Sequence, residues 1–137
     1  MNKRSIIALS TFLFVVLITL FLVSKLQTRE LNSSDYIQSR TPTLFFHGYG
    51  SSANAEKHMA EAARKAGVTQ TIITATVDSH AQVTLKGDIP KDAVNPIVMV
   101  EFADNRNANY AQDGEYAAAV VRELQAKYAF KKMNFVA

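Results

Sequence analysis

Two short polar segments carry the residue types most capable of chemistry. They are His47-Gly48-Tyr49-Gly50-Ser51 and Asp104-Asn105-Arg106. In the first, two glycines bracket a tyrosine, which permits a tight turn with a positive φ angle, and Ser51 or Ser52 could cap a following helix. The second follows a predicted strand, and α/β folds gather ligand contacts at the carboxyl ends of strands. Each segment either contributes to a ligand site or is an ordinary turn or loop.

Several other chemistries lack the residues they need. The chain contains no cysteine, which excludes disulfides, thiolate metal sites and a cysteine nucleophile. His47, His58 and His80 lack metal-ligand spacing, so we expect no metal site and place His58 and His80 at the surface. A phosphate-binding glycine motif is also absent, and we expect no cofactor. Outside the N-terminal leader, basic and acidic residues nearly balance, which does not favour nucleic acid as a partner.

The elements around the first segment form a strand, a turn and a helix. Thr43–Phe46 is a short apolar run, typical of a strand buried on both faces in a parallel sheet. A helix is predicted from about Ala53 to Ala66, ending at Gly67. Its predicted buried face consists of Ala55, Met59, Ala62 and Ala66.

The remainder of the chain continues to alternate strands with helices. Residues 71–77 and 82–85 are predicted to form a hairpin, and 96–102 a further strand. An amphipathic helix is predicted over about 113–128, and 133–137 opens another buried strand. The helix stripe at four-residue spacing is Tyr116, Val120, Leu124 and Tyr128. This alternation predicts an α/β fold with a largely parallel sheet, flanking helices and one hairpin.

The N-terminus has the character of a membrane segment. Ile6–Val23 contains no charged residue, and its eighteen residues would rise about 27 Å as a helix, close to the bilayer hydrocarbon core. Lys3 and Arg4 precede the run, which predicts a cytoplasmic N-terminus and an exported remainder. A cleaved signal peptide is the alternative, although the residues after Val23 offer no good cleavage site. We therefore divide the chain into an anchor or signal at 1–24, a polar tether at 25–41 and a domain at 42–137.

Three segments of that domain together carry a family resemblance. They are TPTLFFHGYGSSANAEKHM from Thr41, NPIVMVEFADNRNANY from Asn95 and the terminal KKMNFVA. Together they resemble the cell-surface α/β-hydrolases of Gram-positive bacteria, a family of unknown function within the α/β-hydrolase superfamily. The resemblance covers nearly everything from Thr41 to Ala137 and corresponds to the N-terminal part of such a domain.

The resemblance implies a role for the glycine turn. In the superfamily, the turn after an early strand donates a backbone N–H to the oxyanion that develops during acyl transfer. By that match Tyr49 would offer its N–H, while His47, Gly48, Gly50 and Ser51 would shape the turn. Because Asp104–Arg106 follow the carboxyl end of a strand, they either line the substrate cleft of the full enzyme or form ordinary loop hydrogen bonds. A structural turn without a catalytic role remains the alternative.

The resemblance also implies which catalytic parts lie elsewhere. The family places its nucleophile in a G-x-S-x-G elbow, a motif that is missing from this sequence, and the acid and histidine follow the nucleophile in chain order. We therefore expect no catalytic residue in this chain, which would be an inactive N-terminal portion with an exposed sheet edge. The implied whole is a membrane-anchored extracellular serine hydrolase acting on a small or lipid-like acyl substrate. The alternative is a non-catalytic anchored module that binds a surface component.

Overall fold

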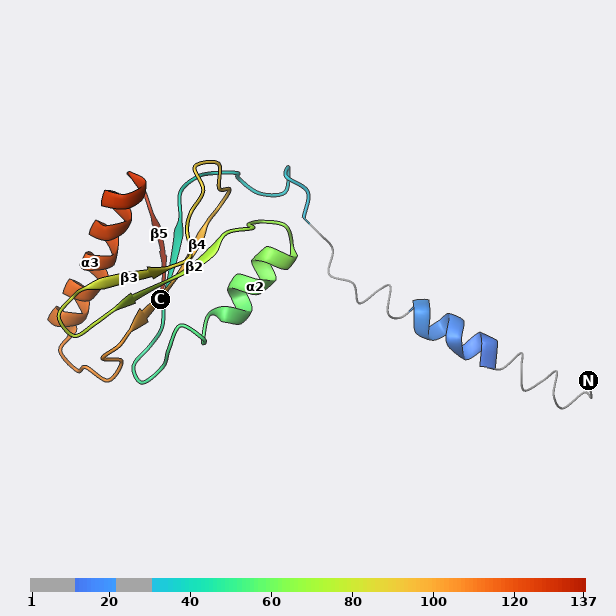
Figure 1. The fold of residues 1–137 in the computed structure, drawn as a ribbon. Helices are drawn as coiled ribbons and strands as arrows, with labels where there is room; N and C mark the ends of the chain where they lie inside the picture. The colour runs from blue at the N-terminus through green and yellow to red at the C-terminus, as the bar shows by residue number, and fades with distance from the viewer. Residues whose placement is uncertain (1–11, 22–30) are drawn as a thin grey trace, which may run out of the picture.

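A mostly parallel sheet lies between two helices. The computed structural model describes residues 12–21 and 31–137, and its five strands follow the order β3-β2-β4-β1-β5 (Figure 1). The bounds are β1 Thr43–Phe46, α2 Lys57–Lys65, β2 Ile72–Val77, β3 Val83–Lys86, β4 Ile97–Phe102, α3 Tyr110–Tyr128 and β5 Asn134–Val136. Only β3 runs antiparallel to its neighbour, β2. The predicted α/β fold with a parallel sheet and one hairpin is confirmed.

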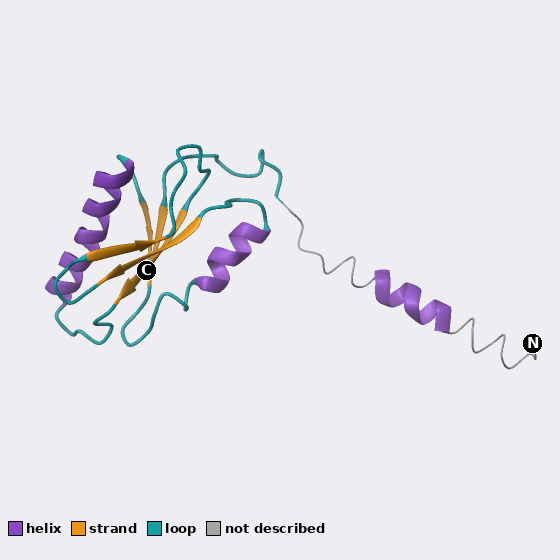
Figure 2. Cartoon of the chain, viewed as in Figure 1, coloured by secondary structure: helices purple, strands orange, loops and turns teal. Residues whose placement is uncertain are grey.

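One face of the sheet packs against α3 and holds the main core. Strand alternation directs Leu44, Ala75 and Val98 to this face. Figure 2 shows α3 lying on one side of the sheet, and this helix contributes the buried stripe predicted from its four-residue spacing. The helix begins at Tyr110, three residues before the predicted start. Asn109 is its N-cap, and its side chain accepts hydrogen bonds from Ala111 N and Gln112 N at 3.1 and 3.4 Å.

The helix on the other face, α2, differs from its prediction. It begins at Lys57 instead of Ala53, and neither Ser51 nor Ser52 caps it, because its N-cap is Glu56 and forms no side-chain cap bond. The backbone N–H of Ala53 donates to the Glu101 carboxylate on β4, which holds this segment to the sheet ahead of the helix.

The predicted buried face of α2 was also wrong. Ala60 is fully buried, whereas Met59 is 52% exposed, and Ala55 and Ala62 are exposed as well. The helix is therefore rotated so that Ala60 faces the sheet. In an alanine-rich segment several faces have similar hydrophobicity, and tertiary contacts decide among them.

The last strand exists but is not buried as predicted. Asn134–Val136 pairs only with β1, at the edge of the sheet. All three of its residues are exposed, Phe135 at 59%. An edge strand without a covering layer leaves apolar side chains in contact with water.

The N-terminal predictions fall partly outside the described residues. Residues 12–21 are helical with exposed apolar side chains, and Thr19 Oγ1 donates to Val15 O at 2.6 Å. In the parts of the chain that the structure describes, no helix has both the length and the apolar character needed to cross a membrane. The predicted run of Ile6–Val23 extends beyond these residues at both ends, so the anchor at 1–24 and the tether at 25–41 stay predictions.

Candidate functional site

The glycine turn after β1 is fixed by a buried histidine. His47 is 7% exposed, its Nδ1 lies 3.0 Å from Gly48 O and its Nε2 accepts from Phe102 N at 3.0 Å. This pattern assigns the proton to Nδ1, because Nε2 must accept. The imidazole also contacts the Phe102 ring edge-on, at 5.3 Å between centroids. His47 therefore joins the ends of β1 and β4 and has no ring nitrogen left for proton transfer.

The second polar segment braces this turn directly. Asn105 Nδ2 donates to Ser51 O at 2.6 Å, and Asn105 O accepts from Gly50 N at 2.6 Å. Gly50 adopts φ +69°, so the positive φ predicted for the turn occurs here. Because β1 and β4 are adjacent and parallel, their carboxyl ends meet, which brings the two segments together.

The backbone N–H groups of the turn are not equally occupied. Gly50 N donates to Asn105 O, and Ser51 N donates to Gly48 O at 3.1 Å. Within residues 12–21 and 31–137, the N–H of Tyr49 has no hydrogen-bond acceptor. Of these three consecutive donors, Tyr49 N–H is therefore the one free to bind an added group.

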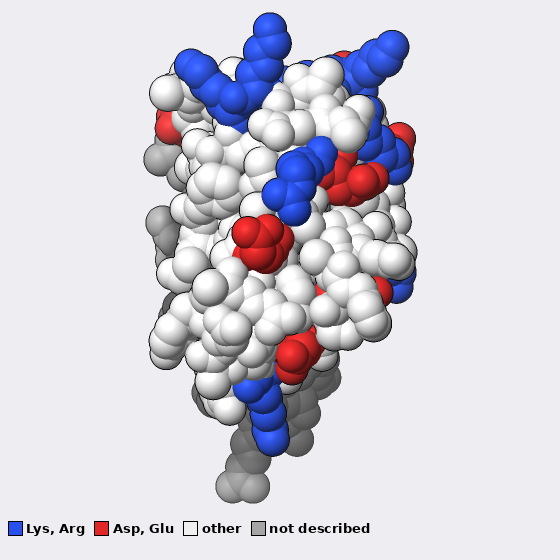
Figure 3. Space-filling model, turned by 90° about the vertical axis from the view of Figure 1, so that its left-hand side faces the viewer, with Lys and Arg blue, Asp and Glu red and all other residues white. Residues whose placement is uncertain are grey.

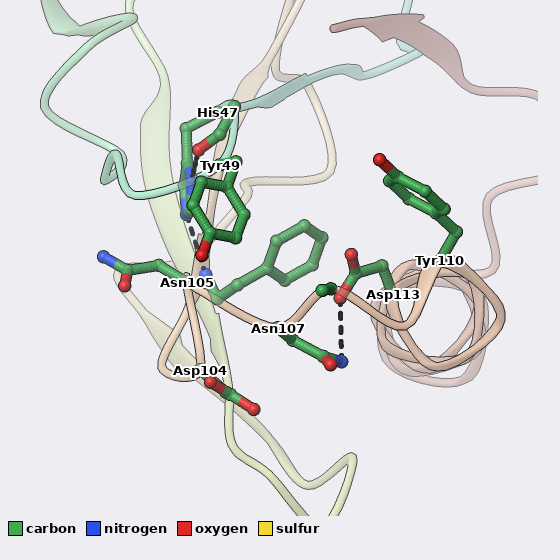
Figure 4. Close-up of a pocket in the computed structure, with 10 residues that line it drawn as sticks. His47, Tyr49, Asp104, Asn105, Asn107, Tyr110 and Asp113 are labelled. Atoms are coloured by element: carbon green, nitrogen blue, oxygen red, sulfur yellow. Dashed lines mark hydrogen bonds between the residues drawn. The ribbon is translucent and has the colours of Figure 1, made fainter.

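The two segments and the start of α3 line one pocket of about 390 Å³. In Figure 4 the Tyr49 ring lies beside Asn105, while Tyr110 and Asp113 reach the pocket from α3. Both tyrosines are largely solvent-exposed, Tyr49 at 74% and Tyr110 at 88%. The lining residues are His47, Gly48, Tyr49, Phe102, Asp104, Asn105, Asn107, Ala108, Tyr110 and Asp113.

The residues singled out from the sequence lie in or beside this pocket. Of the possible cleft loop, Asp104 and Asn105 line the pocket and Arg106 does not, while Gly50 and Ser51 belong to the turn without lining it. Sequence reasoning missed the lining residues that follow Arg106, because it placed the start of the helix at Asp113. Asn109 is a favoured N-cap residue, and this signal could have predicted a helix that begins at Tyr110, beside the pocket.

Carboxylates give the pocket a negative character. Asp104 and Asp113 both line it, and Asp113 Oδ1 accepts from Asn107 Nδ2 at 3.2 Å (Figure 4). Beneath the pocket, burial raises the pKa of Tyr116, and the charges of Asp104, Asp113 and Asp78 raise it further. The Tyr116 hydroxyl donates to Ser79 O at 3.3 Å. This part of the site does not favour an anionic side chain in a ligand.

One serine–histidine contact outside the pocket does not form a catalytic pair. Ser79 Oγ lies 3.4 Å from His80 Nδ1, and both residues are exposed in the β2–β3 turn. Asp78 accepts from the backbone N–H groups of His80 and Gln82, not from the imidazole, so it does not orient that ring. His58 is exposed on α2. Among the described residues, no three His, Asp or Glu side chains gather as a metal site.

Comparisons with known proteins agree on the fold. A crystal structure of a gene product from Listeria innocua aligns with a TM-score of 0.65 and 24% identity, covering 71% of this chain and 38% of that one. A candidate cell surface hydrolase from Lactobacillus plantarum aligns with a TM-score of 0.60 and 19% identity, covering 69% of this chain and 39% of that one. The chain thus spans less than two-fifths of each of these structures. No curated protein matches it.

A family model matches residues 30–137, which include the glycine turn, the pocket and the whole sheet. Its description is alpha/beta hydrolase of unknown function (DUF915). The resemblance read from the sequence is thereby confirmed, and the chain belongs to this α/β-hydrolase family.

Proposed function

We propose that the chain supplies the oxyanion-binding part of a membrane-anchored extracellular serine hydrolase that acts on ester or related acyl bonds. The free N–H of Tyr49 carries the proposal, because the next two residues of the turn, Gly50 and Ser51, already donate to protein carbonyls. A fixed donor of this kind stabilises negative charge that develops on a carbonyl oxygen. His47 and Asn105 hold the turn rigid and so prepare that donor.

Family membership supports the reaction class, and the N-terminal sequence supports the location. Residues 12–21 form a helix with apolar side chains exposed around it, a surface that suits a hydrocarbon environment better than water. One of the structurally similar proteins is described as a candidate cell surface hydrolase. In this proposal the nucleophile, acid and base come from outside these 137 residues, because the sequence has no G-x-S-x-G elbow.

Anion titration followed by NMR tests the oxyanion donor. Acetate added to the ¹⁵N-labelled full chain is expected to shift the Tyr49 amide more than the Gly50 and Ser51 amides, whose N–H groups are engaged. Tyr49→Pro removes the N–H and should abolish the response, whereas the matched Tyr49→Ala variant keeps the N–H and should retain it. Equal shifts at all three amides would contradict the assignment.

A fluorophosphonate probe tests the expected inactivity of this chain. Such probes react with serines that an oriented neighbouring base activates. Ser79 lies beside the His80 imidazole, but Asp78 accepts from backbone N–H groups and does not orient that ring. We expect no labelled serine on the 137-residue chain. Labelling at Ser51, Ser52 or Ser79 would show that a nucleophile was overlooked.

The exposed β5 edge favours a second candidate function. Phe135 and Val136 are apolar and exposed on a strand that could pair with an added peptide, as in β-strand addition. In that case the chain would be a non-catalytic anchored module that binds a surface peptide. Binding of an extended peptide with shifts confined to β5, together with no acetate response at Tyr49, would favour this candidate over the hydrolase.

A further inference from the structure

The end of the domain opposite the pocket is strongly basic. The parallel strands β1, β4 and β5 begin there, since Thr43 is in register with both Ile97 and Asn134. Arg40 precedes β1, and Lys131 with Lys132 precedes β5. Figure 3 shows Lys and Arg side chains gathered at one end of the α3 face, while Figure 1 shows α3 ending beside the starts of these strands.

These cations share one continuous surface. A hollow of about 260 Å³ is lined by Arg40, Lys131 and Lys132, and a second of about 420 Å³ by Arg40, Lys91 and Lys127. Arg40 and Ala129 line both hollows, so the two adjoin. Asp88 is the only acidic residue that lines either of them, and it lies 3.8 Å from Lys127 Nζ. We call Arg40, Lys91, Lys127, Lys131 and Lys132 the basic end.

Most charges of the basic end are available for a partner. Lys91, Lys131 and Lys132 are exposed and form no ion pair with any residue that the structure describes. Arg40 is held in place, because it donates to Tyr128 O at 3.2 Å and its guanidinium lies 4.8 Å from the centre of the Phe130 ring. A fixed cation loses little side-chain entropy when it binds an anion.

The chain reaches the domain at this same end. Leu31 N donates to Ala66 O, just after α2, and Arg40 itself belongs to the segment that leads into β1. A tether arriving from a membrane would therefore bring the basic end toward that membrane. The pocket, lined by Asp104 and Asp113, lies at the opposite end of the strands. The two ends of the domain thus differ in charge. An anionic bilayer surface would attract the basic end and orient the domain with the pocket away from the bilayer.

We propose that the basic end docks on anionic phospholipid headgroups, so that the pocket faces away from the bilayer. This proposal rests on the membrane anchoring proposed above. Lysine and arginine near an anionic bilayer favour binding by about fivefold each, and salt weakens the attraction. A soluble phosphate polymer offers similar charges, but the position of the tether favours the lipid surface as the partner.

Headgroup quenching on the full chain tests the docking. The sequence has no cysteine, so Ala126→Cys in the last turn of α3 and Ala108→Cys at the pocket provide single labelling positions, both exposed. The labelled chain is reconstituted in vesicles of phosphatidylcholine alone, or with phosphatidylglycerol added, each carrying a headgroup quencher. We expect quenching of the Ala126 label only with phosphatidylglycerol at low salt, and little quenching of the Ala108 label in any vesicle.

Paired charge variants make the test specific. Lys131→Gln with Lys132→Gln should lower the ratio of docked to undocked protein by about 25-fold. The matched pair Lys57→Gln with Arg106→Gln removes the same charge from exposed positions away from the basic end and should have little effect. Equal quenching in both lipids, or equal effects of the two pairs, would overturn the proposal.

Two further measurements distinguish the ways in which the idea could fail. Flotation with phosphatidylcholine vesicles reports on the anchor alone, so failure of the chain to float would contradict the anchoring. Quenching by anionic vesicles would still report on docking. Polyphosphate in solution is the second measurement. If it changes the fluorescence of the label at Ala126→Cys, and phosphatidylglycerol causes no quenching, then the basic end binds an anionic polymer and not the bilayer.

Discussion

The two faces of the sheet are covered very differently. On the α3 face, Leu44, Val98 and Val100 are fully buried beneath a helix of nineteen residues. On the other face, Phe45 and Met99 are only partly buried, and the nine-residue α2 buries Ala60 alone. Because hydrophobic stabilisation grows with the apolar area removed from water, the α3 face contributes most of the stability.

The difference indicates separate roles for the two helices. A nine-residue helix is marginal by itself, and α2 lacks a side-chain cap. The segment before it is held by the bond from Ala53 N to Glu101 and by the bond from Asn105 to Ser51 O. We interpret α3 as the helix that stabilises the sheet, and the segment leading to α2 as the part that shapes the glycine turn. Substitutions at four positions test this comparison.

The largest effect is expected at the centre of the α3 face. Leu124 is fully buried, and Leu124→Ala should lower the free energy of unfolding by about 2–5 kcal/mol through lost burial and the cavity left behind. Urea denaturation followed by circular dichroism measures the change. A loss below about 1 kcal/mol would show that α3 does not carry the core.

The cap of α3 should have the next largest effect. Asn109→Ala removes the side-chain oxygen that accepts from Ala111 N and Gln112 N, which should cost about 1 kcal/mol. Asn109→Asp restores an acceptor and should recover most of the stability in the same denaturation experiment. Failure of aspartate to recover it would contradict the capping role of the Asn109 side chain.

The turn that contacts α3 should make stability depend on pH. Backbone hydrogen bonds from Gln82 and, less strongly, His80 lower the pKa of Asp78 below its ordinary value of 3.8. The stabilising contribution of the Asp78 carboxylate is therefore present above pH 3.8, its ordinary pKa. It is lost as the pH falls through the lower pKa of the folded state. Asp78→Asn should lower the melting temperature slightly at pH 7, and the difference from the parent should shrink below pH 3.8. A difference that grows in acid would contradict this sign.

The smallest effect is expected on the α2 face. Met59 is 52% exposed, so Met59→Ala should change the free energy of unfolding by less than about 0.5 kcal/mol. It serves as the matched control for Leu124→Ala, since each truncates a large apolar helix residue to alanine. A loss as large as that of Leu124→Ala would show that the two faces are equally important.

The sequence predicted those parts of the molecule in which local pattern and tertiary structure agree. Thr43–Phe46 and the stripe beginning at Tyr116 follow strong hydrophobic patterns. The stripe is buried as predicted, and the strand forms as predicted, although only Leu44 of its four residues is buried. The buried face of α2 could not be predicted, because alanines lie on several faces of that helix. In addition, the contact between Ala53 and Glu101 joins distant parts of the chain. Local pattern alone indicated a buried last strand, since burial depends on neighbouring layers. The exposed sheet edge was expected only from the family resemblance, and β5 is exposed.

The candidate site divides in the same way. The sequence predicted only that each of the two segments follows a strand. The glycine turn lies beside Asn105 because β1 and β4 are adjacent and parallel, so that their carboxyl ends meet. The clamp made by His47 was not predicted, because its partner Phe102 N is a backbone group on another strand. Arg106 follows Asn105 directly but does not line the pocket, since the orientation of a loop side chain depends on three-dimensional contacts.

The strand order has a consequence for how this chain acquires its structure. β1 precedes the other strands of the sheet in sequence yet lies between β4 and β5, which follow much later. During synthesis, its apolar residues cannot pair with β4 or with β5 until each of those strands has emerged from the ribosome. Such long-range parallel pairing slows folding and prolongs the exposure of aggregation-prone apolar segments to solvent. We therefore expect nascent β1 to be the part of the domain that most needs chaperone protection.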